Sequence, residues 1–134
     1  FDQAFENVIK QSLANANLQP EDIGHIHGHG MSTINADRGE AVAINKIFGN
    51  QTPVVAAKSY MGNLGAGSGS VEMISSLLAL DKGTLFKTLN YDTPDPLCDI
   101  QVTNSIDIPA GDSFINLNAS PQGQASAVVI KSLQ

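Results

Sequence analysis

The spacing of apolar residues predicts three helices along the chain. Over residues 2–17 apolar side chains recur every three or four positions, which is the stripe of a helix that packs by one face. A second stripe predicts a helix that begins at Asn35 or Asp37 and ends at Phe48. The third helix, over residues 71–80, is apolar on nearly every side, so we expect it to be buried all round in an inner layer.

Short apolar runs between and after these helices predict strands. They cover residues 23–28, 53–57, 113–118 and 125–131. The run 53–57 is continuous and partly β-branched, as is typical of a strand covered on both faces. The order helix, strand, helix, strand, helix, strand, strand predicts an α/β fold whose mixed sheet is mostly parallel and ends in an antiparallel hairpin.

Polar side chains follow the first two predicted strands. Residues 29–33 read His-Gly-Met-Ser-Thr, and residues 58–66 read Lys-Ser-Tyr-Met-Gly-Asn-Leu-Gly-Ala. Open α/β sheets bind their ligands at the carboxyl ends of strands. The sequence therefore predicts a site where these two segments meet.

The composition limits the classes of function. With 134 residues, of which 42% are hydrophobic, residues 1–134 are expected to form a single globular domain. The net charge of −6, with no cluster of Lys or Arg, argues against a nucleic-acid partner, and no apolar run is long enough for a membrane span. The single cysteine, Cys98, cannot form an internal disulfide, which fits a cytoplasmic location. Because the chain opens at Phe1 directly in a helical pattern, we expect it to be a piece of a longer protein.

The histidines of the first predicted strand allow two kinds of chemistry. His29 lies between Gly28 and Gly30 at the strand end, where an imidazole can donate its Nε2 proton to a developing oxyanion; a structural histidine is the alternative. His25, His27 and His29 alternate along the strand and so share one face, and a His-x-His pair at this spacing can chelate zinc. No cysteine or carboxylate completes such a ligand set in the sequence pattern. The competing interpretation treats His25 and His27 as solvated or hydrogen-bonded side chains.

Two further features suggest no separate chemistry. The glycine-rich stretch 62–69 lacks the Lys-Ser/Thr ending of a P-loop, so we interpret it as close packing ahead of the third helix rather than as a phosphate cradle. The first turn of that helix places a partial positive charge near Asn63. Cys98 has acidic neighbours that raise a thiol pKa, which argues against a nucleophilic role.

Three motifs taken together carry a family resemblance. They are residues 29–33 with the later Asp37 and Glu40, residues 58–67 with the later Glu72, and the proline-rich loop 93–99. In order and spacing they resemble the C-terminal half of the β-ketoacyl acyl-carrier-protein synthases, the condensing enzymes of fatty acid and polyketide synthesis.

The resemblance implies a fold and a reaction. The fold would be a three-layer αβα half of a thiolase-like fold, and the reaction a decarboxylative Claisen condensation of an acyl thioester with malonyl-carrier protein. In such enzymes a cysteine of the N-terminal half takes the acyl group as a thioester, so this chain alone is expected to be inactive. No resident cofactor is implied, because the phosphopantetheine arm arrives on the acyl carrier protein. The full-length synthase would form a homo- or heterodimer.

The resemblance also implies roles for individual residues. His29 and Asn63 occupy the positions that donate hydrogen bonds to the thioester oxygen, and Lys58 occupies the position that organises the second donor. Ser32 and Thr33 fall where the family places substrate-binding hydroxyls. Supporting positions are held by three acidic residues, Asp37, Glu40 and Glu72.

The chain departs from the family pattern at three places. Asn63 replaces the second histidine; its amide can donate a hydrogen bond but cannot carry a proton or a positive charge, although related enzymes that start from coenzyme A thioesters use a Cys-His-Asn set. Met31 replaces a hydroxyl residue, and residues 118–124 lack the aromatic residue and two glycines of the family's gate loop. These departures support an alternative hypothesis, a non-catalytic subunit of the chain-length-factor type that pairs with an active partner.

Overall fold

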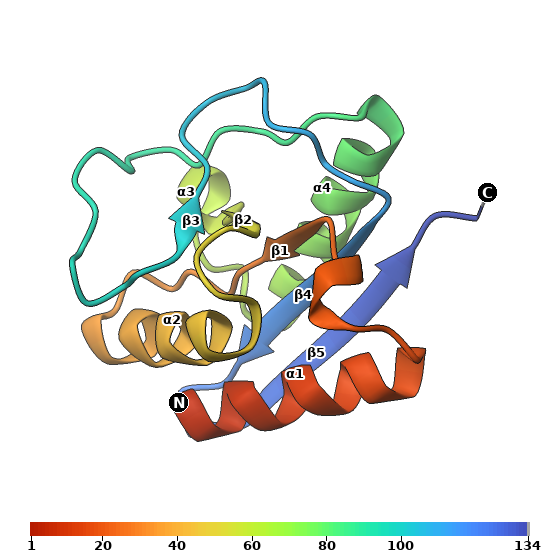
Figure 1. Cartoon of the computed structure of the whole chain (residues 1–134). Helices are drawn as coiled ribbons and strands as arrows, with labels where there is room; N and C mark the ends of the chain where they lie inside the picture. Colours follow the sequence, from red (N-terminus) through yellow and green to blue (C-terminus); the bar gives the residue numbers. More distant parts are fainter. Residues whose placement is uncertain (134) are drawn as a thin grey trace.

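Five strands form one sheet in the order β3-β2-β1-β4-β5 (Figure 1). The computed structural model describes residues 1–133. The strands are β1 (His25–His27), β2 (Pro53–Val55), β3 (Gln101–Val102), β4 (Ser113–Ala119) and β5 (Ala125–Lys131). All neighbouring pairs are parallel except β4 and β5, which pair antiparallel. The predicted mixed sheet with an antiparallel hairpin at its end is therefore confirmed.

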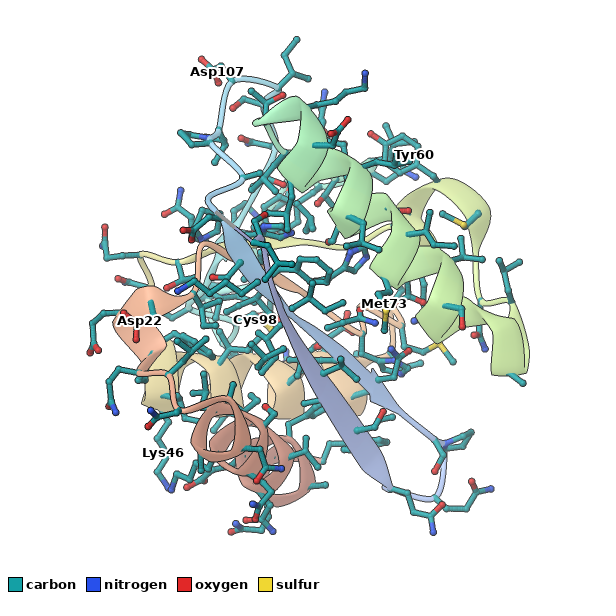
Figure 2. The ribbon with its side chains drawn as sticks, turned by 90° about the vertical axis from the view of Figure 1, so that its right-hand side faces the viewer. Asp22, Lys46, Tyr60, Met73, Cys98 and Asp107 are labelled. Atoms are coloured by element: carbon teal, nitrogen blue, oxygen red, sulfur yellow. The ribbon has the colours of Figure 1, made fainter. Side chains whose placement is uncertain are left out.

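Helices cover both faces of this sheet. α1 (Asp2–Ala16) and α2 (Ile34–Phe48) lie on one face, and α4 (Ser68–Lys82) lies across the sheet from them (Figure 2). A single helical turn, α3 (Lys58–Met61), follows β2, and two 3₁₀ turns, η1 (Pro20–Asp22) and η2 (Gly65–Gly67), complete the connections. This is the expected αβα layering. No helix within residues 1–133 is long and apolar enough to cross a membrane.

Each face of the sheet has its own apolar cluster. On the side of α1 and α2 the buried residues include Phe5, Ile9, Ile26, Ile44, Val54, Ile115 and Leu117. On the side of α4 the cluster is smaller and consists of Val55, Ala79, Leu85 and Ala110. Burial of one large aliphatic or aromatic side chain contributes about 1.5–3 kcal/mol, so most of the hydrophobic stabilisation lies under α1 and α2.

Two neighbouring strands, β1 and β2, are shorter than the sequence predicts. β1 and β2 have three residues each, because the chain leaves the sheet in glycine-rich and helical turns. Lys58 does not extend β2 but begins α3. β3, with two residues at the sheet edge, was not predicted at all, since an element of that length carries no apolar period.

α4 differs from its prediction in which of its faces is buried. The apolar residues Ile74, Leu77 and Leu78 are 55%, 42% and 57% exposed, whereas the polar residues Glu72 and Ser76 are 2% and 0% exposed. The expectation of a helix buried all round is thus wrong for this chain. The polar side of the helix faces the sheet because polar partners meet it there.

Candidate active site

The loop after β1 carries His29 and is held by a buried carboxylate. Glu40 on α2 accepts the backbone N–H of His29 at 2.5 Å and that of Gly30 at 3.1 Å. Burial raises the pKa of Glu40 to about 7, and the two backbone N–H groups oppose that rise. Gly30 has a φ of +52°, and a Cβ at this position would lie 2.7 Å from the Cβ of Ala56. The close approach of this loop to the end of β2 therefore requires glycine.

The hydrogen bonds of His29 identify which ring nitrogen carries the proton. Its Nδ1 accepts the backbone N–H of Ala119 at 3.3 Å, and Lys58 Nζ lies 3.4 Å from the same nitrogen. Because both neighbours are donors, Nδ1 is unprotonated and the proton of the neutral ring is on Nε2. Burial and the charge of Lys58 lower the pKa of His29 to about 4, while hydrogen bonding by Asn118 acts in the opposite direction. At neutral pH the ring is an uncharged donor through Nε2.

Lys58 forms a buried ion pair beside this ring. Its Nζ lies 3.0 Å from each carboxylate oxygen of Glu72 on α4, and both side chains are almost fully buried. Burial raises the pKa of Glu72, and the contact with Lys58 opposes that rise. Two N–H groups of the ammonium are thereby directed to Glu72, which leaves the third for Nδ1 of His29.

Asn63 is oriented by its neighbours in the turn ahead of α4. Its Oδ1 accepts the hydroxyl of Ser68 at 3.0 Å and the backbone N–H of Gly65 at 3.2 Å. The Ser68 hydroxyl in turn accepts the backbone N–H of Leu64 at 2.7 Å. With its oxygen engaged, the side chain has its Nδ2 donor free of any hydrogen bond to residues 1–133.

His29 and Asn63 line the same cavity. Its volume is about 620 Å³, and it lies between the first turn of α4 and the strands β4 and β5. Ser68 and Asn116 also line it, as does the β4–β5 connection over residues 118–124. The structure therefore brings the two predicted donors to one space, next to the loop in which the sequence departs from its family pattern.

Ser32 and Thr33 line a second, separate cavity. This one has a volume of about 330 Å³ and is also lined by Asp37, Glu40 and Cys98. Asp37 accepts the backbone N–H of Ser32 at 3.2 Å, and burial raises its pKa. The structure thus separates the two hydroxyl residues from the cavity that holds Asn63.

His25 and His27 are fully buried and hydrogen-bonded, so of the two states in the competing interpretation, solvated or hydrogen-bonded, the structure shows the second. Both rings contact the hydroxyl of Ser76 on α4, and their remaining nitrogens bond to backbone groups of Ala110 and Ala57. All four ring nitrogens are occupied. Residues 1–133 include no group of three His, Cys, Asp or Glu side chains placed to hold a metal ion, so the zinc hypothesis has no ligand set there.

Cys98 lies in the loop between α4 and β3, away from the cavity of His29. Burial raises the pKa of its thiol, and so do the nearby carboxylates of Asp95 and Asp37. This confirms the predicted effect of neighbouring negative charge, and a thiol with a raised pKa is a poor nucleophile at neutral pH.

The sequence analysis did not identify several residues that hold the site in place. Ser68 orients Asn63, the backbone N–H of Ala119 fixes the proton of His29, and Ser76 joins the two strand histidines. Asn116 donates to the Gly69 carbonyl at 3.1 Å while its buried Oδ1 has no hydrogen-bond partner within residues 1–133. For Ser76 a signal existed, since a serine four residues after Glu72 shares its face of a helix.

Comparison with known proteins identifies the family. Residues 2–92 match the family model described as the β-ketoacyl synthase C-terminal domain. The chain belongs to the β-ketoacyl synthase family. Over 101 residues it is 37% identical to 3-oxoacyl-acyl-carrier-protein synthase 2 of Coxiella burnetii, a stretch that makes up 73% of this chain and 24% of that protein.

Two solved synthase structures have the same fold over nearly the whole chain. One is a type II polyketide ketosynthase in complex with its acyl carrier protein, with a TM-score of 0.93 and 27% identity. The other is described as the ishigamide ketosynthase/chain length factor, with a TM-score of 0.93 and 24% identity. Each match covers 99% of this chain and 34% of the solved chain. This synthase domain thus spans about a quarter to a third of the relatives that it matches.

Proposed function

We propose that this domain is the C-terminal part of a 3-oxoacyl-acyl-carrier-protein synthase of fatty acid or polyketide synthesis. The full-length protein would catalyse decarboxylative Claisen condensation of an acyl thioester with malonyl-carrier protein. One observation carries the proposal: a neutral His29 with its proton on Nε2 and an Asn63 with a free Nδ2 line the same cavity.

In the proposed reaction these two groups act on the malonyl thioester. Loss of CO₂ breaks a carbon–carbon bond, and the electron pair that remains forms an enolate whose negative charge lies on the thioester oxygen. Two N–H donors aimed at that oxygen stabilise the charge as it develops. The enolate carbon then attacks the acyl carbonyl, and the enzyme's cysteine leaves as a thiolate. Asn63 acts only as a dipolar donor in this scheme, because an amide neither gives up nor accepts a proton.

Lys58 maintains the chemical state of His29. Its positive charge 3.4 Å from Nδ1 disfavours protonation of that nitrogen, so the proton stays on Nε2, where the substrate oxygen would lie. Glu72 holds Lys58 in place, and Glu40 holds the backbone of His29 and Gly30. We assign these three residues positioning roles.

The nucleophile and the partners belong to the proposed full-length protein. Cys98 is unsuited to acyl transfer, so we infer that the acylated cysteine lies in the remaining part of the synthase. The exposed apolar residues Ile74, Leu77 and Leu78 of α4 support a further part that packs on this face.

The phosphopantetheine arm of the carrier protein would supply the substrate without a resident cofactor. Ser32, Thr33 and Asp37 form the second cavity, beside which that arm would pass. A homo- or heterodimer is the assembly that we propose.

The alternative function is a non-catalytic subunit that pairs with an active synthase and sets product length. It is favoured by Asn63 in place of histidine and by the β4–β5 connection, which reads Asn-Ala-Ser-Pro-Gln-Gly-Gln without an aromatic residue. A connection of this kind beside the cavity cannot place a bulky ring across its entrance.

The test is decarboxylation of malonyl-carrier protein by the full-length protein that contains this domain. We expect His29→Ala and Asn63→Ala each to lower kcat by about 10²–10³-fold, the usual effect of removing one oxyanion donor. Gln11→Ala, which removes an exposed amide on α1, is the matched control and should retain full activity. Equal rates in all variants would remove both residues from the mechanism. A wild-type protein without decarboxylase activity would support the alternative function.

A further inference from the structure

Three fully buried side chains, His25, His27 and Ser76, form a hydrogen-bonded chain behind the site. The Ser76 hydroxyl lies 2.7 Å from Nδ1 of His27 and 2.9 Å from Nε2 of His25. At one end Nδ1 of His25 lies 2.8 Å from the carbonyl oxygen of Ala110. At the other end the backbone N–H of Ala57 donates to Nε2 of His27 at 3.2 Å.

The two end groups fix every proton in this chain. A carbonyl only accepts, so Nδ1 of His25 carries a proton and its Nε2 is free to accept. A backbone N–H only donates, so Nε2 of His27 is unprotonated and its Nδ1 carries the proton. Ser76 therefore accepts from His27 and donates to His25. With both rings neutral, every polar atom of the three side chains is paired.

Burial agrees with neutral rings. It lowers the pKa of His25 and is the largest cause that lowers the pKa of His27 to about 3. The chain of hydrogen bonds therefore keeps one arrangement across the neutral pH range.

This chain connects the two elements that carry Lys58 and Glu72. Ala57, whose N–H is held by His27, immediately precedes Lys58 at the start of α3. Ser76 follows Glu72 by four residues on α4, so the two side chains lie on the same face one turn apart. His27 thus contacts the residue that precedes Lys58 and the serine one turn after Glu72, and it does not line the cavity of His29. A shift of either element would move the ammonium of Lys58 away from Nδ1 of His29.

We propose that His27, with Ser76, is a positioning pair that places Lys58 and Glu72 beside Nδ1 of His29 and thereby keeps the donor proton on Nε2. The catalytic consequence of this placement rests on the function proposed for His29. The placement itself does not, so it can be tested by a measurement that needs no turnover.

The test is a histidine NMR titration of the full-length protein, with the His29 resonance identified by its loss in His29→Gln. In His27→Leu the Ala57 N–H loses its acceptor, and in Ser76→Ala both histidines lose their bridge. We expect the pKa of His29 to rise above about 4 in both variants, because the charge of Lys58 no longer lies beside Nδ1, while burial of the ring, the largest cause of the lowered pKa, remains. His27→Gln, whose Oε1 can accept the Ala57 N–H, should restore much of the wild-type pKa.

Ile26→Val is the control for a merely structural effect. Ile26 lies between the two histidines on β1 and is fully buried on the opposite face, so its truncation loosens the same strand without touching the chain. It should leave the pKa of His29 unchanged. An unchanged pKa in His27→Leu or in Ser76→Ala, or an equal rise in Ile26→Val, would overturn the proposal. Should His27→Leu fail to fold, Ser76→Ala carries the same test.

A kinetic measurement then separates this proposal from the proposed function. If the wild-type protein decarboxylates malonyl-carrier protein, Ser76→Ala should lower kcat by about 10–100-fold at an unchanged KM, as expected when a catalytic group is misplaced by about 1 Å. A higher KM with unchanged kcat would contradict positioning of His29. If the wild-type protein has no such activity, the proposed function fails while the titration still decides the placement.

Discussion

At the scale of single residues, the state of His29 is set by groups that do not react. The Ala119 N–H and the Lys58 ammonium face Nδ1, and the Glu40 carboxylate accepts the backbone N–H groups of His29 and of the next residue. The ammonium of Lys58 favours the neutral form of the His29 ring, and Glu72 at 3.0 Å is the buried counter-ion of that ammonium. In the proposed function the Nε2 donor would thus be set before substrate binds, which is the condition for strong electrostatic stabilisation.

Gly30 is the residue whose backbone this arrangement depends on most. Gly30→Ala places a Cβ 2.7 Å from Ala56 and a side chain at a φ of +52°. We expect a loss of about 1–3 kcal/mol of stability, together with a displaced His29. Chemical denaturation of the full-length protein measures the first effect, and the His29 titration measures the second.

Gly67→Ala provides the comparison, since its backbone needs no positive φ and its added Cβ has no neighbour within 4 Å. It should be close to neutral. A Gly30→Ala variant as stable as Gly67→Ala would show that the loop is free to move away from β2.

Residue patterns predicted where the site lies better than how it is held. His29, Lys58 and Asn63 follow strand ends in the sequence. In the structure His29 and Asn63 line one cavity, and Lys58 lies beside His29. By contrast, the contact of Ala119 with His29 joins segments that meet only in the fold, and the contact of Ser68 with Asn63 depends on the particular turn ahead of α4. Serine and a backbone N–H have no pattern of their own, so no reading of the sequence alone would find them.

At the scale of elements, the spacing of apolar residues predicted the positions of α1 and α2 well, but it predicted the wrong burial for α4. The sequence predicted that α4 is buried all round, yet its apolar residues Ile74, Leu77 and Leu78 are exposed and the side on the sheet carries Glu72 and Ser76. The reason is that β1 presents two histidines and α3 presents a lysine to this face, and buried polar groups must be paired. The spacing of apolar residues predicts hydrophobic packing, whereas α4 packs on the sheet through the hydrogen bonds of Glu72 and Ser76.

The contact between β1 and α4 should make stability depend on pH through His27. Its pKa is about 3 in the folded protein and 6.5 in an unfolded chain, so the unfolded state binds more protons between these values. The stabilisation that the neutral, buried His27 contributes is therefore complete above pH 6.5, and it is lost as the pH falls from 6.5 toward 3. Relative to His27→Gln, we expect the wild-type free energy of unfolding to fall by roughly 2–3 kcal/mol between pH 7 and pH 4.5.

Denaturant unfolding of both proteins at several pH values measures this difference. The raised pKa of Glu40 makes stability rise as the pH falls, which is opposite to the effect of His27. Because this effect of Glu40 is the same in the wild type and in the variant, it cancels in the comparison. Parallel curves for the two proteins would mean that His27 is exposed to solvent or already charged.

At the scale of the whole molecule, the domain carries only part of what the proposed reaction requires. It supplies a cavity of about 620 Å³ with two hydrogen-bond donors, while its only cysteine lies elsewhere with a raised pKa. The chain spans about a quarter to a third of its relatives, and the apolar side of α4 is uncovered. These facts together support the proposal that the remaining part of a synthase packs on α4 and brings the acylated cysteine to the cavity.

The central claim is that His29 and Asn63 bind one and the same oxygen atom. The most direct test is a crystal structure of the full-length protein with a malonyl thioester analogue that cannot lose CO₂. The account predicts the thioester oxygen at about 2.7–3.1 Å from both Nε2 of His29 and Nδ2 of Asn63. An oxygen within hydrogen-bond distance of only one of these nitrogens, or an analogue bound outside this cavity, would contradict it.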